Sequence, residues 1–335
     1  MKINQRLFDY YGINTQKDIG IKKNCPRPFD TVLIDKQGSC YACECQSWLP
    51  QSIGNLQIRS LEKIIGSDIH NHIRKAIEDG TYRYCNENQC SYIRDKQVYE
   101  SYFLHAPPTH VKHLRLAIDD SCNLRCPSCR TGMVFHKEGS AYRLGIRLAD
   151  KINEWLQQYR HPVQVHIGSD GDPFASHIYR HFMANTPDRS NITYSILTNG
   201  LMFKDFHDRV PHVINGLKKL ALSIDGASQD TYEKLRLGGK WDRLLENIEH
   251  MSAAKERYGF DLHWHMVVQN DNWKEMSPLA DMATKHGVDR LFLNKIEDWN
   301  TALDHSQQDF MSHNGFKEEL ARAMKHPIVR SWTLS

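Results

Sequence analysis

Six short apolar runs alternate with helical stretches after about residue 110, and this alternation constrains the fold more than any other feature of the sequence. The runs have the period-2 pattern of β-strands and cover residues 111–118, 163–167, 192–197, 217–224, 262–268 and 290–296. Helical spacing covers residues 143–159, 230–255 with a break at Gly238-Gly239, and 273–286. Successive β–α units imply parallel strands. We therefore expect an α/β fold, either a doubly wound sheet or a partial (βα)₆ TIM-type barrel, with ligands at the C-terminal ends of the strands.

The first hundred residues have a different pattern. Residues 30–35 and 39–44 flank Lys36-Gln37-Gly38 and predict a β-hairpin. We expect one helix after it, ending at Gly80, with an apolar stripe formed by Leu61, Ile64, Ile65, Ile69, Ile73 and Ile77. The Pro-containing segment at residues 105–110 predicts a linker. These patterns predict a small Cys-rich α+β domain at residues 1–107, an α/β core at 108–300 and a C-terminal helical extension at 301–335.

The net charge, the apolar runs and the cysteine count together favour an intracellular protein and exclude few partners. The chain has 43 Lys+Arg against 40 Asp+Glu, so its net charge of +3 gives no general argument for a nucleic-acid or membrane partner. We find no apolar run long enough to span a bilayer and no apolar core of a secretory signal at the N-terminus. Nine cysteines, an odd number, indicate thiols kept for metals or catalysis. We expect a cytoplasmic protein, in the host cytoplasm if it is viral.

Three cysteines lie close together directly after the first core strand. Cys122, Cys126 and Cys129 have C-x₃-C-x₂-C spacing. Three thiolates without a nearby fourth can bind three irons of a [4Fe–4S] cluster and leave the fourth iron open. A structural zinc site is the alternative, and it would need a distant His or Cys as fourth ligand.

This spacing, in the loop after the first strand of a six-unit βα chain, resembles the radical S-adenosylmethionine (SAM) enzymes. Residues 168–173, 198–200, 223–226 and 268–270 match further segments of that family in order, although each short match is also compatible with an ordinary turn or loop. The resemblance implies a [4Fe–4S] cluster on Cys122, Cys126 and Cys129, with SAM on its open iron. It implies that SAM is bound by Gly171, Asp172, Thr198, Asn199, Ser223, Asp225, Arg236 and Val268. Asp172 stands where the family usually has Glu, and Ser128 where it usually has an aromatic residue.

The N-terminal cysteines resemble a second module. Cys25 and Cys43 lie in a C-x₁₂-G-x₄-C pattern, and Cys85-x₄-Cys90 follows the predicted helix. This pattern resembles the SPASM and twitch modules, and it implies that these four cysteines hold one auxiliary [4Fe–4S] cluster. A Cys₄ zinc site has the same spacing and stays an alternative. Cys40 and Cys45 are then core thiols, or one of them replaces Cys43 as ligand.

The resemblance implies an oxidoreductase or isomerase. Such an enzyme takes an electron from a flavodoxin- or ferredoxin-like reductant, cleaves SAM to a 5′-deoxyadenosyl radical and abstracts hydrogen from an unactivated carbon. We expect an amino-acid-like or peptide substrate, contacted by His263, His265 and Trp299 if these side chains are not structural. One alternative is a phage-type isomerase acting on an amino-acid-modified thymine in DNA. Another is a non-catalytic zinc-binding protein.

Overall fold

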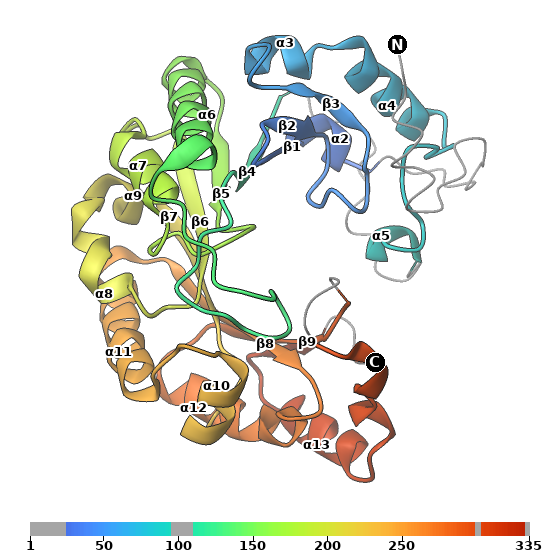
Figure 1. The fold of residues 1–335 in the computed structure, drawn as a ribbon. Coiled ribbons are helices and arrows are strands. Elements are labelled where there is room, and N and C mark those ends of the chain that lie inside the picture. Colours follow the sequence, from blue (N-terminus) through green and yellow to red (C-terminus); the bar gives the residue numbers. More distant parts are fainter. Residues whose placement is uncertain (1–24, 95–109, 299–302, 332–335) are drawn as a thin grey trace. The chain divides into compact units, whose positions relative to one another are not determined.

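The computed structural model describes residues 25–94, 110–298 and 303–331 (Figure 1). The chain forms two compact units, the first from residues 1–119, 138–170 and 185–193, and the second from residues 120–137, 171–184 and 194–335. An element that crosses a boundary is described with the unit that holds most of it. The domain division predicted at residues 107 and 300 stays a prediction.

The first unit contains a five-stranded part of the sheet in the order β5-β4-β1-β2-β3. Its strands are β1 (Thr31–Asp35), β2 (Ser39–Tyr41), β3 (Ser52–Asn55), β4 (His113–Ala117) and β5 (Val163–Ile167). The predicted hairpin is confirmed, because β1 and β2 pair antiparallel with Leu33 opposite Tyr41. β3, which the sequence did not predict, adds a third antiparallel strand. β1 also pairs parallel with β4, so the hairpin extends the sheet that contains the first core strand.

The helices of the first unit are α2 (Arg27–Asp30), α3 (Leu61–Ile65), α4 (Asp68–Glu78), α5 (Ser91–Arg94) and α6 (Gly139–Gln158). The prediction of one helix over the apolar stripe is wrong, because the chain breaks between α3 and α4 at Gly66 and Ser67. Ser67 Oγ accepts a hydrogen bond from the His70 N–H (3.3 Å) and donates one to the Ile53 carbonyl (2.9 Å). A serine N-cap begins a new helix here while the apolar stripe continues across the break.

The second unit contains five parallel strands in the order β10-β9-β8-β7-β6. They are β6 (Ile192–Thr198), β7 (Leu217–Ser223), β8 (Asp261–Val268), β9 (Arg290–Lys295) and β10 (Val329–Ser331). The helices are α7 (His177–Asn185), α8 (Phe203–Phe206), α9 (Pro211–Asn215), α10 (Gln229–Leu235), α11 (Trp241–Tyr258), α12 (Met276–Lys285) and α13 (Phe316–Ala323). Short 3₁₀ turns cover His207–Arg209, Trp273–Glu275, His305–Gln307 and Phe310–Ser312.

The predicted α/β fold is confirmed, because the core strands whose pairing is described pair in parallel within each unit. Each of the six predicted core strands is present within two residues of its predicted ends. The predicted helix break is also present, since α10 ends before Arg236 and α11 begins at Trp241. The core side of β8 is formed by Leu262, Trp264, Met266 and Val268, all fully buried. In the described residues, no helix is both long and apolar enough to cross a bilayer.

Candidate active site

Three cysteine thiols lie in the loop that follows β4. The Cys122 N–H donates to the Val134 carbonyl (2.9 Å), and the Cys129 N–H donates to the Cys126 carbonyl (3.0 Å). Cys122 and Cys126 are buried, whereas Cys129 is exposed. Burial raises the pKa of Cys122 to about 11, and the Asp172 carboxyl adds to this effect. Burial also raises the pKa of Cys126, so a metal or a neighbouring cation would favour the thiolate form of both buried cysteines.

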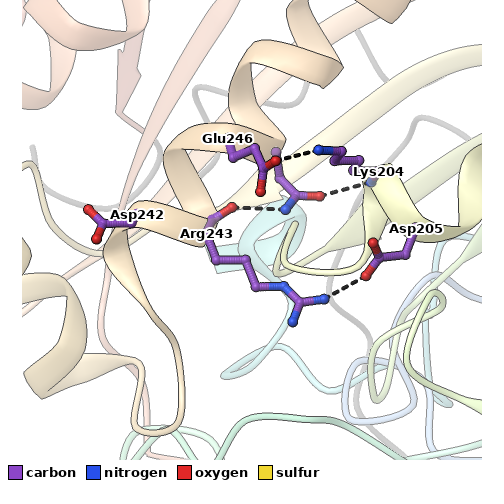
Figure 2. Close-up of a pocket in the computed structure, with 6 residues that line it drawn as sticks. Lys204, Asp205, Asp242, Arg243 and Glu246 are labelled. Carbon is purple, nitrogen blue, oxygen red and sulfur yellow. Dashed lines mark hydrogen bonds and ion pairs between the residues drawn. The ribbon is translucent and has the colours of Figure 1, made fainter.

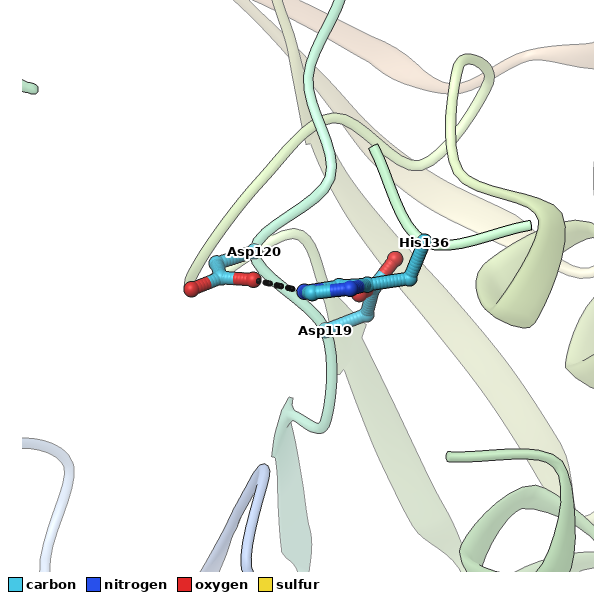
Figure 3. Close-up of side chains that lie close together, drawn as sticks. All are labelled: Asp119, Asp120 and His136. Carbon is cyan, nitrogen blue, oxygen red and sulfur yellow. Dashed lines mark hydrogen bonds and ion pairs between the residues drawn. The ribbon is translucent and has the colours of Figure 1, made fainter. Parts of the chain in front are cut away.

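A contact between Asp120 and His136 joins the two ends of the loop that carries the cysteines. His136 Nε2 lies 2.9 Å from Asp120 Oδ1, and Figure 3 shows this contact beside Asp119. The His136 N–H also donates to Ser121 Oγ (2.8 Å), and Arg130 Nη1 donates to the Asp120 carbonyl (2.8 Å). The loop that carries the three cysteines is thus fixed by its own polar residues.

Asp172, after β5, connects two loops through its carboxylate. Its Oδ2 accepts hydrogen bonds from Thr198 Oγ1 and from the Asn199 N–H, both at 2.7 Å. Its Oδ1 accepts from the N–H groups of Phe174 (3.1 Å) and Ala175 (3.0 Å). Burial raises the pKa of this carboxyl, and the four hydrogen bonds act in the opposite direction. A carboxylate has about four acceptor positions, so protein donors fill those of Asp172.

The Thr198-Asn199-Gly200 turn at the end of β6 directs an amide at one of the thiols. Asn199 Nδ2 donates to Asn123 Oδ1 (2.8 Å) and lies 3.6 Å from Cys122 Sγ. Gly200 has a φ of +83°, and a Cβ at this position would lie 2.5 Å from Leu222 Cδ1. Glycine is therefore required for the turn that places Asn199 beside the cysteine loop.

A buried ion pair lies after the C-terminal end of β7. Arg236 Nε is 2.8 Å from Asp225 Oδ2, and the two side chains are 12% and 1% exposed. Asp225 Oδ1 accepts a hydrogen bond from the Val267 N–H (2.9 Å). Arg236 Nη1 also lies 3.9 Å from Cys126 Sγ. Burial acts to lower the pKa of Arg236, but the charges of Asp225 and Cys126 outweigh it and raise that pKa, so Arg236 stays charged.

The three cysteines fit the ligand set of an iron–sulfur cluster. Hydrogen-bond donors face all three sulfurs, as is suited to thiolates. The pairs are Asn199 with Cys122 (3.6 Å), Arg236 with Cys126 (3.9 Å) and Arg130 with Cys129 (3.8 Å). Over the described part of the chain, no three thiol sulfurs lie within 4.8 Å of one another. Four thiolates around one zinc ion, at about 2.3 Å from it, would lie about 3.8 Å apart. As placed, the sulfurs are too far apart for one zinc ion bound by all three thiols.

The remaining residues predicted to bind SAM or substrate differ in burial and in their place on the strands. Gly171 has a φ of +69° and directly precedes Asp172. Ser223 is half-buried at the end of β7, whereas the Val268 side chain is fully buried. His263 and His265 lie on β8, and the His265 ring stacks on Phe292 with centroids 4.8 Å apart. Trp299 lies outside the described residues.

The N-terminal cysteines form a separate group in the first unit. Cys25, Cys43, Cys85 and Cys90 line one small cavity, together with Arg27, Pro28, Trp48, Leu49, Tyr82, Tyr92 and Ile93. Burial raises the pKa of Cys43 well above its usual value, and the charges of Cys90 and Cys25 add to it. Cys40 and Cys45 do not line this cavity. Cys40 donates to the Gly38 carbonyl (3.7 Å), and Cys45 Sγ lies 3.1 Å from Ser47 Oγ.

Sequence reasoning missed two residues that hold the loop after β7. Asn272 Nδ2 donates to the carbonyls of Asp225 and Val267, both at 2.9 Å. Glu275 accepts hydrogen bonds from the Ala227 N–H (2.5 Å), Ser228 Oγ (2.6 Å) and Thr231 Oγ1 (2.5 Å). The only signal in the sequence was two polar residues at the start of a predicted helix, which is also typical of ordinary helix capping.

A charged hollow between α8 and α11 has a structural role. Figure 2 shows Lys204 paired with Glu246 and Arg243 paired with Asp205. The distance from Arg243 Nη2 to Asp205 Oδ2 is 2.6 Å. Asn247 of α11 joins the two helices by accepting from the Lys204 N–H of α8 (2.8 Å), and it also donates to the Arg243 carbonyl in its own helix (2.8 Å). These charges neutralise one another, so we assign no chemistry to this hollow.

Comparison with known proteins identifies a family and distant relatives. The sequence model of the radical SAM superfamily matches residues 118–283. A GTP 3′,8-cyclase of Alkaliphilus metalliredigens is 25% identical over 67% of this chain and 67% of its own length. A GTP 3′,8-cyclase of Ectopseudomonas mendocina is 22% identical over 66% of this chain and 64% of its own length. A probable GTP 3′,8-cyclase of Methanococcus maripaludis is 26% identical, but the match covers only 42% of this chain and 45% of that protein.

Among solved structures, the chain is similar to Streptococcus suis SuiB bound to the precursor peptide SuiA. The TM-score is 0.48 at 13% identity, over 66% of this chain and 48% of SuiB. A likeness this distant says nothing about the substrate of this chain.

Proposed function

Residues 118–283 of this chain form a radical SAM domain, and from this premise we propose that the protein is a radical SAM oxidoreductase or isomerase. The family implies a [4Fe–4S] cluster and SAM. When bound, this pair supplies a 5′-deoxyadenosyl radical, because one electron passed to SAM breaks its S–C5′ bond and releases methionine. The observation that carries the proposal is the set of donors from Asn199, Arg236 and Arg130 that face the three cysteine sulfurs.

In this proposal the residues of the site divide into two groups. Cys122, Cys126 and Cys129 would hold the cluster as thiolates. SAM would be bound by Gly171, Asp172, Thr198, Asn199, Ser223, Asp225, Arg236 and the backbone at Val268. Because the Asp172 carboxylate already accepts four protein hydrogen bonds, we propose that it acts by shaping the loop whose backbone meets SAM. A flavodoxin- or ferredoxin-like protein would supply the electron.

We further propose that Cys25, Cys43, Cys85 and Cys90 hold an auxiliary [4Fe–4S] cluster. Two observations support this proposal. All four thiols line one cavity. Over the described residues no three thiol sulfurs are within 4.8 Å of one another, which is too wide for one zinc ion. Iron and zinc analysis of the anaerobically purified protein tests it: about eight irons per chain support two clusters, whereas about four irons with stoichiometric zinc would contradict the second.

For the substrate we propose an amino-acid-like or peptide molecule, as predicted from the sequence. A second candidate is a purine nucleotide, because the curated relatives at 22–26% identity are named for GTP. A modified thymine in DNA is a third candidate, and it rests only on the resemblance to phage-type isomerases.

The test is 5′-deoxyadenosine formation by the reconstituted, dithionite-reduced protein, measured by mass spectrometry. GTP is added in one reaction, and extract of the native source is added untreated, protease-treated or nuclease-treated in others. Stimulation that is lost with protease supports a peptide, stimulation lost with nuclease supports a nucleic acid, and stimulation by GTP supports the nucleotide. Absence of 5′-deoxyadenosine in every reaction, in a protein that contains iron, would overturn the proposed activity.

A further inference from the structure

Among the three side chains that face the cysteine sulfurs, Arg236 alone is a cation whose neighbouring sulfur belongs to a buried cysteine. Asn199 beside Cys122 is neutral, and Arg130 lies beside Cys129, which is exposed. Arg236 is charged, only 12% exposed, and lies 3.9 Å from the buried Cys126 sulfur. A charge acts more strongly on its neighbour where water is excluded.

Backbone contacts fix the position of Arg236. Its N–H donates to the Tyr232 carbonyl (2.8 Å), and its carbonyl accepts from the Gly239 N–H (2.7 Å). Tyr232 is fully buried, and a Cβ on Gly239 would lie 2.9 Å from the Arg236 carbonyl oxygen. The residue therefore lies in a tight, packed turn between α10 and α11.

Asp225 orients the guanidinium of Arg236. It engages Nε at 2.8 Å, while the Val267 N–H holds the other carboxylate oxygen at 2.9 Å. With Nε held in this way, Nη1 of Arg236 faces Cys126. Asp225 also neutralises part of the positive charge, so its effect on the sulfur is opposite in sign to that of Arg236.

We propose that Arg236 is a positioning residue that raises the reduction potential of the cluster bound through Cys126, and that Asp225 limits this increase. Reduction adds one electron from an external donor such as dithionite and makes the cluster and its thiolates more negative. A fixed cation near a ligand sulfur stabilises the reduced form. This inference rests on the proposed cluster, and it assigns to Arg236 a role that does not depend on SAM.

The test is an EPR-monitored redox titration of the reconstituted holoprotein without SAM, which follows the signal that Cys126→Ala removes. We expect Arg236→Met, which keeps length but removes the charge, to lower the ratio of reduced to oxidised cluster at least tenfold at fixed potential, a negative shift of about 59 mV or more. Asp225→Asn should raise that ratio, because it leaves Arg236 uncompensated. Arg236→Lys should recover part of the shift, and Arg243→Met, at the surface, should leave the potential unchanged.

Opposite shifts for the Arg236 and Asp225 variants would distinguish this role from loss of packing. A ratio in Arg236→Met within twofold of the wild-type value would overturn the inference. An unchanged reduction potential in Arg236→Met together with weaker SAM binding would also overturn it, because Arg236 would then act on the SAM carboxylate instead. Shifts of the same sign in both variants would overturn it as well. If the wild-type protein gave no cluster signal, the proposed function would fail, and this result would be recognised before any variant was compared.

Discussion

Replacing Asp172 with asparagine turns one buried acceptor oxygen into an N–H donor. The Phe174 and Ala175 N–H groups keep their acceptor if the amide oxygen stays at the Oδ1 position. Thr198 Oγ1, now 2.7 Å from Oδ2, can rotate its hydroxyl and accept from the new amide. The Asn199 N–H, also at 2.7 Å, then faces another N–H and loses its acceptor.

The expected cost follows from these contacts. A buried donor without an acceptor costs about 1–3 kcal/mol, and a hydrogen bond to a charged group contributes about 1.5–3 kcal/mol. Thr198 can form a new hydrogen bond to the amide, but the Asn199 N–H is left without an acceptor. We therefore expect the free energy of unfolding to fall by about 3 kcal/mol. At about 2 °C per kcal/mol for a chain of this length, the apparent Tm should fall by about 6 °C.

The assay is anaerobic scanning calorimetry of the holoprotein at one scan rate, with Asp205→Asn as a matched control. Asp205 pairs with Arg243 at 2.6 Å, but its side chain is 50% exposed. An exposed ion pair contributes less than about 1 kcal/mol, so the control should change Tm by about 1–2 °C at most, on the order of the measurement error. If Asp172→Asn lowered Tm no more than Asp205→Asn, the carboxyl would not be the ionised acceptor of its four donors, and the reasoning would be refuted.

Three further variants test other parts of the structure. Gly200→Ala should lower Tm more than Gly259→Ala, because both glycines have positive φ but only at Gly200 would a Cβ meet a side chain, at 2.5 Å; equal losses would contradict this. Burial lowers the pKa of His265 to about 3, so as pH falls below about 6.5 the unfolded chain takes up a proton that the fold excludes, and stability falls by up to about 1.4 kcal/mol per pH unit. His265→Phe keeps a ring on Phe292 and should show a shallower fall in Tm from pH 7.5 to 5; an unchanged slope would show that His265 does not cause it. Cys126→Ala should abolish 5′-deoxyadenosine formation and keep the visible absorbance of the proposed N-terminal cluster, whereas equal loss of both signals would indicate misfolding.

Local patterns predicted most of the core and less of the N-terminal region. Period-2 runs located all six core strands, because burial of one strand face imposes an alternation that is visible in the sequence. The apolar stripe over residues 61–77 predicted one helix and concealed a break, since the stripe stays in phase across Gly66 and Ser67. β3 was missed because its four residues, Ser52–Asn55, are too few and too polar to show a pattern.

The sequence alone determined the candidate ligands, because the spacing of Cys122, Cys126 and Cys129 places three thiols on one short loop wherever that loop lies in the fold. It could not determine which groups face their sulfurs. Asn199 is 77 residues from Cys122 and Arg236 is 110 residues from Cys126, and these contacts depend on parallel strands bringing their C-terminal ends to one edge. The tertiary structure likewise decided that protein donors fill the Asp172 carboxylate and that Asp225 pairs with Arg236, because burial leaves each of these charges no water to replace its partner.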